Sequence, residues 1–237
     1  MSGDPGKAGV ATPPATPADP ALSRRLPRAG RVLAVCAHPD DETFGLGALI
    51  TAFVDAGVPV ELLCLTLGEA STLGAGRDLG ARRGRELGCA ARVLGIGRVT
   101  LGDHPDGHLA TVPLATLADE VLAAARDADT LLVFDHGGVT GHPDHQRATD
   151  AALAAAERLD ARVLAWALSR AVADRLDEET GVQLVGREDP SLTHRLTVDR
   201  TRQLAAMSCH VSQLDDNPVP RHRIRIQGPV EHLRTLR

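Results

Sequence analysis

Two short clusters of histidines and carboxylates carry the strongest chemical signal in this 237-residue chain. The first, His38-Pro-Asp-Asp-Glu42, directly follows the apolar run 31–37, and the second, His142-Pro-Asp-His145, comes soon after the apolar run 130–135. Imidazole nitrogens and carboxylate oxygens are suitable zinc ligands, and a catalytic zinc site uses three of them and keeps one position for water. Two such clusters, each after an expected strand, therefore predict a mononuclear metal site.

The first cluster combines metal ligands with a spare carboxylate. Because Asp40 and Asp41 are adjacent, their side chains point in different directions, so one is expected to touch the metal while the other acts on the bound water. Acids at this point also favour the N-terminus of the helix that follows, and Glu42 fits such a capping role. Capping alone requires neither consecutive acids nor a preceding histidine, so the metal interpretation is the stronger one.

The second cluster is ambiguous by itself. His142 and His145 are three residues apart at an expected loop-to-helix junction, and residues at that spacing share one face of a helix. Both could reach one pocket, with one binding metal and the other contacting substrate. Without the first cluster, a helix capped by Asp144 that leaves both histidines exposed would be the better interpretation.

The segments that carry the clusters alternate between strand and helix patterns. This alternation predicts an α/β fold, a Rossmann-like three-layer α/β/α arrangement with a mostly parallel sheet of strand order about 3-2-1-4-5. The first and fourth strands would be neighbours where the winding reverses, which brings together two clusters about a hundred residues apart. Strands are expected over 32–37, 58–67, 98–101, 130–135, 162–168 and 192–198, helices over 43–56, 78–94, 114–126, 143–159 and 199–213, and an irregular tail from 218.

Composition and charge narrow the class of protein. Residues 1–28 are rich in Pro, Ala, Gly and Thr without apolar periodicity, so we expect a disordered tail followed by one domain over 29–237. The formal net charge of −5 and the lack of a long basic run argue against a nucleic-acid partner. The sequence shows no membrane span or signal peptide, and none of its four cysteines forms a CxxC pair. Buried, reduced thiols in a cytoplasmic protein are therefore expected.

Further polar residues follow the second and third strands at the same edge of the predicted sheet. The loop after the third strand could contact substrate or could simply form a turn on Pro105-Asp106-Gly107, and the two interpretations are equally supported. Arg83 could bind a phosphate or a sugar hydroxyl, although a solvated helix face is the commoner outcome for such a residue. The residues in question are Glu69, Arg77, Arg82 and Arg83 after the second strand, and Asp103, His104, Asp106 and His108 after the third.

Together the two clusters resemble those of a known enzyme family. The pair Ala37-His-Pro-Asp-Asp-Glu42 and His142-Pro-Asp-His145 is similar to the motifs of the LmbE-like/PIG-L de-N-acetylases. These include N-acetylglucosaminyl-phosphatidylinositol, mycothiol-pathway and bacillithiol-pathway enzymes and several antibiotic-tailoring enzymes. The resemblance extends over about residues 31–213. Supporting matches are Thr66-Leu-Gly-Glu69, Arg83-Gly-Arg-Glu86, Asp106-Gly107 and His210-Val-Ser-Gln213.

The resemblance implies a role for each residue of the two clusters. Asp40 would be the general base, His142 as an imidazolium would stabilise the tetrahedral intermediate, and Asp144 would orient a neighbouring histidine. A divalent metal, usually Zn²⁺ with Fe²⁺ also compatible, would be bound by His38, Asp41 and His145. Substrate would be contacted by Glu69, Arg83 and Asp106.

Two departures from the family pattern limit what can be transferred. Some relatives carry a tyrosine near the second cluster that helps to bind the oxyanion, and this chain contains no tyrosine. Sugar sites often use aromatic stacking, yet the chain has only three Phe and one Trp. The metal chemistry is therefore expected to transfer better than specificity for a sugar.

The leading hypothesis is a zinc-dependent hydrolase that removes an acyl group, acetyl first of all, from a small-molecule N-acyl amide such as an N-acetylglucosamine conjugate or a natural-product intermediate. An alternative within enzymes is a metal-dependent amidase that acts on a thiol conjugate or another non-sugar amide in secondary metabolism. An alternative from another class is a metal-binding scaffold without catalysis, against which the intact base Asp40 argues. The sequence leaves the oligomeric state open, a homo-oligomer included.

Overall fold

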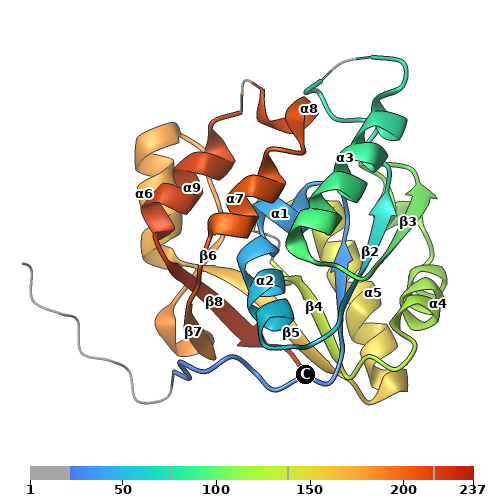
Figure 1. The fold of residues 1–237 in the computed structure, drawn as a ribbon, viewed down its shortest axis with the longest axis horizontal. Helices are drawn as coiled ribbons and strands as arrows, with labels where there is room; N and C mark the ends of the chain where they lie inside the picture. Colours follow the sequence, from blue (N-terminus) through green and yellow to red (C-terminus); the bar gives the residue numbers. More distant parts are fainter. Residues whose placement is uncertain (1–21, 75, 138, 216) are drawn as a thin grey trace, which may run out of the picture.

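Figure 1 shows one mixed β-sheet with helices on both of its faces. The computed structural model describes residues 22–237 except 75, 138 and 216. The strands run in the order β3-β2-β1-β4-β5-β8-β7, and β6 pairs with β5 outside this path. The strands are β1 Val32–Cys36, β2 Val60–Thr66, β3 Arg98–His104, β4 Thr130–Phe134, β5 Arg162–Ser169, β6 Gly186–Arg187, β7 His194–Thr197 and β8 Val230–Thr235. The helices are α1 Asp41–Phe44, α2 Gly47–Asp55, α3 Leu79–Leu94, α4 Leu114–Ala125, α5 Pro143–Leu159, α6 Arg170–Thr180, α7 Thr201–Met207, α8 Val211–Leu214 and α9 Val219–Gln227.

The first five strands form the parallel part of the sheet. β1 pairs with β2 and β4, β2 also pairs with β3, and β4 also pairs with β5, all in parallel. The predicted strand order 3-2-1-4-5 and the α/β class are therefore confirmed. Parallel strands covered on both faces are buried along their whole length, as β1 and β4 are.

Alternate residues of each strand enter two separate cores, one on each face of the sheet. In β1, Val32 and Ala34 join the core that contains side chains of α2, α3 and α7, while Leu33 and Val35 join the core with α4 and α5. The α4/α5 core is rich in alanine, and its described members include no aromatic residue. The aromatic members of the opposite core are Phe53, Phe134 and Trp166.

The helix predicted over residues 43–56 is in fact two helices, α1 and α2, with a break at Gly45 and Leu46. A Cβ atom at Gly45 would lie 2.4 Å from Phe134 Cζ and 2.8 Å from Trp166 Cζ3. The two rings therefore pack directly on the backbone, and a larger residue would push them away. The break separates the short helix α1, which begins at Asp41, from the core helix α2.

The C-terminal segment also differs from the prediction of an irregular tail. It forms α9 and β8, and β8 pairs antiparallel with both β5 and β7. The apolar pattern of β8 is interrupted by Glu231 and His232, which are buried nonetheless. Glu231 accepts hydrogen bonds from Trp166 and Arg200, partners that a local sequence pattern does not show.

Two of the four cysteines form a disulfide. Cys89 of α3 is bonded to Cys209, in the turn before α8, with Cα atoms 5.8 Å apart. The expectation of reduced thiols is wrong for this pair, whereas Cys36 and Cys64 are free and buried. The partners are 120 residues apart and meet because α3 packs against α7. The disulfide also removes one of the grounds for expecting a cytoplasmic protein.

The predicted disordered tail, residues 1–28, falls mostly outside the described residues, and for 1–21 it stays a prediction. Residues 22–28 run beside the sheet, where Ser23 forms a parallel bridge with His194 and the Arg28 carbonyl accepts a hydrogen bond from Arg162. Within the described part of the chain, no helix has both the length and the apolar character needed to cross a bilayer.

Candidate metal centre

The first cluster occupies the turn between β1 and α1. The Oδ2 atom of Asp41 accepts hydrogen bonds from the backbone N–H groups of Ala37 (3.0 Å) and His38 (2.9 Å), which folds the turn back over the strand end. Asp40 has a φ angle of 120°, a conformation that residues with a side chain rarely adopt. Such strain persists only where the surrounding contacts impose it, and it is common at functional sites. The turn presents three polar side chains, those of His38, Asp40 and Asp41, at one point.

The second cluster lies at the N-terminus of α5, next to the first because β1 and β4 are neighbours. His145 Nε2 is 3.0 Å from Asp41 Oδ1, although the two residues are 104 positions apart in the sequence. One ligand atom from each of His38, Asp41 and His145 lies within 4.8 Å of the other two, so the three could hold a metal ion. His145 is only 7% exposed, so the alternative of an exposed histidine on a capped helix is wrong for it.

A second set of possible ligands, made of His38, His142 and Asp144, shares His38 with the first. The carboxylate of Asp144 is already engaged, because it accepts hydrogen bonds from the N–H groups of Gly107 (2.8 Å) and Leu109 (3.0 Å). It also faces His38 Nε2 at 3.3 Å. Asp144 therefore fits the expected role of orienting a histidine better than that of a ligand, and the His38–Asp41–His145 set is the better metal site.

Negative charge is concentrated around His38. Its Nε2 atom lies 3.1 Å from Asp106 Oδ1 and 3.3 Å from Asp144 Oδ2. Burial lowers the pKa of His38, but hydrogen bonds to these two carboxylates outweigh burial and raise the pKa to about 10. A positive charge is thus strongly favoured here, and a divalent cation would satisfy the same carboxylates. The donor set and its electrostatics therefore fit a metal ion such as Zn²⁺.

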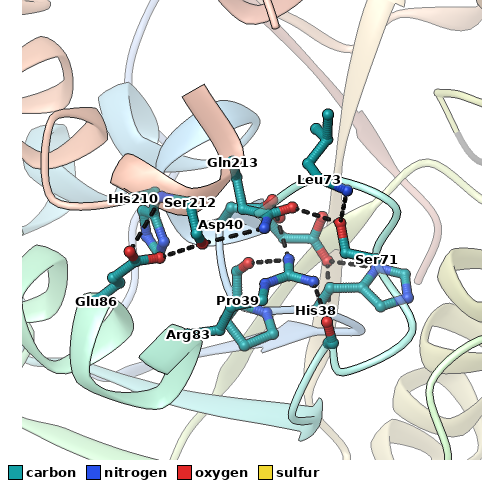
Figure 2. A network of polar contacts seen from close by, with 12 residues as sticks. His38, Pro39, Asp40, Ser71, Leu73, Arg83, Glu86, His210, Ser212 and Gln213 are labelled. Atoms are coloured by element: carbon teal, nitrogen blue, oxygen red, sulfur yellow. Dashed lines mark hydrogen bonds and ion pairs between the residues drawn. The ribbon is translucent and has the colours of Figure 1, made fainter. Parts of the chain in front are cut away.

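Arg83 holds Asp40 beside the ligands (Figure 2). Its Nη2 atom donates to Asp40 Oδ2 at 3.1 Å and to the Pro39 carbonyl at 2.5 Å, and its Nη1 atom donates to the Gly68 carbonyl at 2.6 Å. Burial raises the pKa of Asp40 to about 6, although the charge of Arg83 opposes the change. A buried carboxyl group with a raised pKa is suited to proton transfer. Arg83 also lines the cavity, but these N–H groups point at the turn after β1 and at the loop after β2, so its contact with substrate stays a prediction.

Asp106 and Glu69, both expected to contact substrate, are placed differently. Asp106 lines the cavity, contacts His38 and accepts a hydrogen bond from the Ala70 N–H at 2.9 Å. Glu69 is not among the described residues of the cavity wall, and its carboxylate accepts a hydrogen bond from the Asp106 N–H at 3.0 Å. Glu69 therefore holds the loop that carries Asp106.

His142 lines the cavity beside His38, with ring centroids 4.9 Å apart. Its Nδ1 atom accepts a hydrogen bond from the Asp144 N–H at 3.1 Å, so the proton of the neutral ring is on Nε2. Burial, together with the charges of His38 and His145, lowers the pKa of His142. The contact with the Asp144 N–H is compatible with a neutral Nε2–H donor at the cavity wall, and the imidazolium form of the expected mechanism stays a prediction.

A buried polar network supports the first turn from the C-terminal part of the chain (Figure 2). Glu42, which is 0% exposed, pairs through Oε1 with His210 Nε2 at 2.5 Å and accepts the Asp40 N–H through Oε2 at 2.9 Å. The second bond agrees with the expected cap, whereas the first ties the turn to a residue far along the chain. Ser212 donates to Glu86 of α3 at 2.6 Å in the same region. The sequence matched His210 to a family motif but gave it no role.

The clusters open into a cavity of about 580 Å³ that is lined by both polar and apolar side chains. Three of the chain's four aromatic residues line it, so the low aromatic content of the sequence does not extend to this site. Their positions carry no local signal of a site, because Phe134 and Trp166 lie in ordinary apolar runs and Phe44 lies at the start of an expected helix. Polar members of the wall include Ser71, Asp106, Gln213 and Asn217, and apolar members include Phe44, Phe134, Trp166 and Leu184.

The last helix and strand hold two of the aromatic residues of the cavity, Phe44 and Trp166. Arg223 of α9 donates to the Phe44 carbonyl at 2.5 Å, and its guanidinium carbon lies 5.1 Å from the Trp166 ring centroid. Glu231 of β8 accepts from Trp166 Nε1 at 2.7 Å and from Arg200 Nη1 at 2.6 Å, and it lies 3.5 Å from Arg223 Nη1. The region that the sequence predicts as an irregular tail therefore forms part of the candidate site.

A three-layer α/β fold with a histidine–carboxylate cluster beyond two adjacent parallel strands defines a candidate metal-dependent hydrolase. The family comparison makes the class definite. The family model described as GlcNAc-PI de-N-acetylase (PIG-L) matches residues 33–156, just over half of the chain. The chain belongs to this family of de-N-acetylases.

Individual relatives carry related names. The 1D-myo-inositol 2-acetamido-2-deoxy-alpha-D-glucopyranoside deacetylase of Corynebacterium glutamicum is 28% identical over 249 residues, covering 85% of this chain and 83% of that protein. The enzyme of the same name from Kineococcus radiotolerans is 31% identical over 173 residues, covering 59% of this chain and 48% of that protein, so the match spans about half of that relative. The crystal structure of a deacetylase triple mutant of the teicoplanin biosynthetic pathway has a TM-score of 0.66 at 20% identity and covers 86% of this chain and 97% of that one. This last likeness shows the fold.

Proposed function

We propose that the chain is a zinc-dependent hydrolase that removes an acyl group, acetyl first of all, from a small-molecule N-acyl amide of the N-acetylglucosamine type. The observation that carries the proposal is the convergence of His38, Asp41 and His145 within 4.8 Å. This set lies beside the buried carboxyl group of Asp40, at the wall of a cavity of about 580 Å³. Membership of the PIG-L family and the names of the relatives support an acetamido sugar as the substrate class.

His38, Asp41 and His145 would hold the metal ion. When bound there, the ion would supply Lewis-acid polarisation of the amide carbonyl and would lower the pKa of its water toward about 7. The protein contributes the position of the site, since backbone N–H groups fix Asp41 and both histidines are buried or nearly so.

The other residues of the two clusters would move protons and stabilise charge. Asp40, held by Arg83, would take the proton of the attacking water and return it to the departing amine. His142 would donate its Nε2–H to the oxygen of the tetrahedral intermediate, a contact typically worth about 3–4 kcal/mol in such enzymes. Asp144 would keep His38 oriented.

The test separates the base from the ligands. Asp40→Asn should keep its zinc, measured by elemental analysis, and lose about 10²- to 10⁴-fold in kcat on an N-acetylglucosamine conjugate. Asp103→Asn is the matched control, because Asp103 is exposed and outside the described cavity wall. Unchanged turnover in Asp40→Asn would refute the assignment of the base.

Two finer questions have direct tests. Apoprotein reloaded with Zn²⁺ or Fe²⁺ should show which ion supports turnover, and turnover that persists after complete removal of metal would contradict the proposal. Parallel assays of N-acetylglucosamine conjugates and non-sugar amides separate the sugar hypothesis from the amidase alternative.

We also propose that the enzyme acts in the cytoplasm, where fractionation should find it. Because disulfides are rare in cytoplasmic proteins, the Cys89–Cys209 disulfide is the observation against which this location has to be measured.

A further inference from the structure

The Cys89–Cys209 disulfide lies next to the buried network that holds the turn after β1. Cys209 directly precedes His210, whose buried ring pairs with Glu42 at 2.5 Å. Glu42 in turn accepts a hydrogen bond from the Asp40 N–H at 2.9 Å. The residue that follows one of the bonded cysteines is therefore only two contacts away from the backbone of the proposed base.

The other cysteine belongs to the helix that carries Arg83. Arg83, Glu86 and Cys89 follow one another at intervals of three along α3, so each lies beside the next on the helix surface. Glu86 accepts hydrogen bonds from the N–H (3.0 Å) and the hydroxyl group (2.6 Å) of Ser212 (Figure 2). Arg83 donates to Asp40 at 3.1 Å. This row of side chains thus joins the disulfide to α8 and to the turn after β1.

The disulfide is the covalent link of this interface and is open to attack. It ties together two segments 120 residues apart in the sequence. Cys89 and Cys209 are both partly exposed, whereas the free cysteines Cys36 and Cys64 are buried. Thiol–disulfide exchange requires a thiolate to reach a sulfur atom, so exposure favours it at this pair. Disulfides in cytoplasmic proteins, the location proposed for this chain, are usually transient and often redox-sensing.

We propose that Cys89 and Cys209 form a thiol–disulfide exchange site, at which a low-molecular-weight thiol slows amide hydrolysis by loosening the support of Asp40. The proposal rests on the proposed function, in which Asp40 is the base. A thiolate forms a bond to one cysteine sulfur, the bond between the cysteines breaks, and the other cysteine leaves as a thiolate that takes up a proton. A second thiolate attacks the mixed disulfide, releases the remaining cysteine and departs bonded to the first. Two thiols are oxidised, the protein disulfide is reduced, and the small-molecule disulfide reverses both steps.

The metal ligands are held independently of this interface. Asp41 is fixed by the backbone N–H groups of Ala37 and His38 within its own turn, and His145 belongs to α5. Opening the disulfide should therefore spare the metal and displace Asp40, whose guanidinium partner lies on α3. This predicts a loss in kcat without a loss of zinc.

The first experiment measures turnover of the zinc-loaded full chain on an N-acetylglucosamine conjugate, in buffers of varied ratio of reduced to oxidised glutathione. As the disulfide opens, followed by thiol alkylation and mass spectrometry, kcat should fall about 3- to 10-fold with KM changed less than about twofold. Zinc content should stay constant, and oxidised glutathione should restore the rate. The double variant Cys89→Ser/Cys209→Ser is the control, and it should turn over at the reduced rate at every ratio.

The second experiment is backbone amide hydrogen exchange, which needs no turnover. Opening the disulfide in the zinc-loaded protein should speed exchange about threefold or more in peptides covering residues 208–214 and 38–44. A peptide covering residues 150–159 of α5 is the internal control and should keep its rate. Faster exchange confined to 208–214 would overturn the proposal, because the disulfide would then not act on the turn after β1.

The outcomes separate the exchange site from the proposed function. An unchanged kcat in protein shown to be reduced overturns the exchange site as a control of rate and leaves the deacetylase proposal intact, as does a disulfide that opens only when the chain unfolds. An equal loss in wild type and the double variant, or a loss of zinc, also overturns it, because glutathione would then act on the metal. Failure of every form to hydrolyse the amide contradicts the proposed function, and the exchange rate of residues 38–44 then decides the coupling alone.

Discussion

The two turns that supply the candidate metal ligands differ in what holds the side chains next to the metal site. The turn after β1 is strained at Asp40 and is held by buried charged side chains, Arg83 on one side and the Glu42–His210 pair on the other.

The turn after β4 is anchored by charge where it leaves the strand, since the buried Asp135 pairs with Arg187 and Arg234. It also reaches α5 through the contact of His136 with Asp150, at 2.6 Å. Beside the ligand His145, however, its hydrogen bonds are longer and involve neutral groups. Among its described residues, Thr140 Oγ1 lies 3.3 Å from both His145 Nδ1 and the His142 N–H nitrogen.

This difference shows where precision is required. The first turn contributes two ligands and the base, so small shifts in it would affect metal binding and proton transfer together. The turn after β4 leads to one ligand, His145, which lies near the start of α5. The backbone of that long helix fixes the position of His145. We therefore expect substitutions in the support of the first turn to have larger effects than those in the second.

The largest effect is expected from Glu42→Ala, which leaves His210 buried without its partner. Breaking a buried ion pair costs about 3–5 kcal/mol, and the release of a proton from His210 would reduce this to about 2–4 kcal/mol. The free energy of unfolding from urea titration measures it. Glu42→Gln, which keeps a hydrogen-bond acceptor for the Asp40 N–H, should lose less. Equal stability of Glu42→Ala and wild type would show that the pair does not hold the turn.

Arg83→Lys should be next, because a single ammonium group cannot serve Pro39, Asp40 and Gly68 together. We expect kcat to fall about 10- to 100-fold with KM changed less than about threefold, since Arg83 positions the base. Arg82→Lys is the control, because the side chain of Arg82 is 43% exposed and pairs with Glu86. A rise in KM at unchanged kcat would instead make Arg83 a direct substrate contact.

The pH dependence of stability should report the Glu42–His210 pair. Burial lowers the pKa of His210, but the charge of Glu42 outweighs burial and the net pKa is raised. The folded state then holds a proton that the unfolded state releases above about pH 6.5, so the free energy of unfolding should fall as pH rises, by at most about 1.4 kcal/mol per unit. His210→Gln should lack this component. A stability that rises with pH through this range in wild type alone would contradict the assigned direction.

The smallest effect is expected from Thr140→Val in the second turn. It removes a hydroxyl group whose two contacts are at the long end of hydrogen bonding, so stability should fall by about 1 kcal/mol or less. The melting temperature and the zinc content measure the result. Loss of the metal in this variant would show that the second turn is as finely supported as the first and would remove the contrast between them.

How much of the fold and of the candidate site the sequence predicts depends on how far apart in the chain the interacting residues lie. The strand order was predictable because apolar runs and short links restrict an α/β chain to few topologies. The two clusters were predictable as partners because each follows a strand and those strands are neighbours at the switch point. The break at Gly45 was missed, since it depends on two rings from β4 and β5.

The residues that support the two clusters could not be predicted from the sequence, for the same reason. Glu42 looks like a helix cap, but only the fold shows that His210 reaches it from a segment 168 residues away. Cys89 and Cys209 show no pairing signal in their spacing, and the aromatic residues of the cavity are scattered along the chain. The misassigned tail from residue 218 contains buried charges whose partners lie in other elements.

By itself the sequence determined the class of fold, the family and the side chains that could hold a metal, because these are written in local runs and short motifs. The tertiary structure alone decided which charges support those side chains, which cysteines pair and which rings shape the cavity wall. Such choices depend on contacts between distant segments, and their energies arise only when folding has removed water from between them.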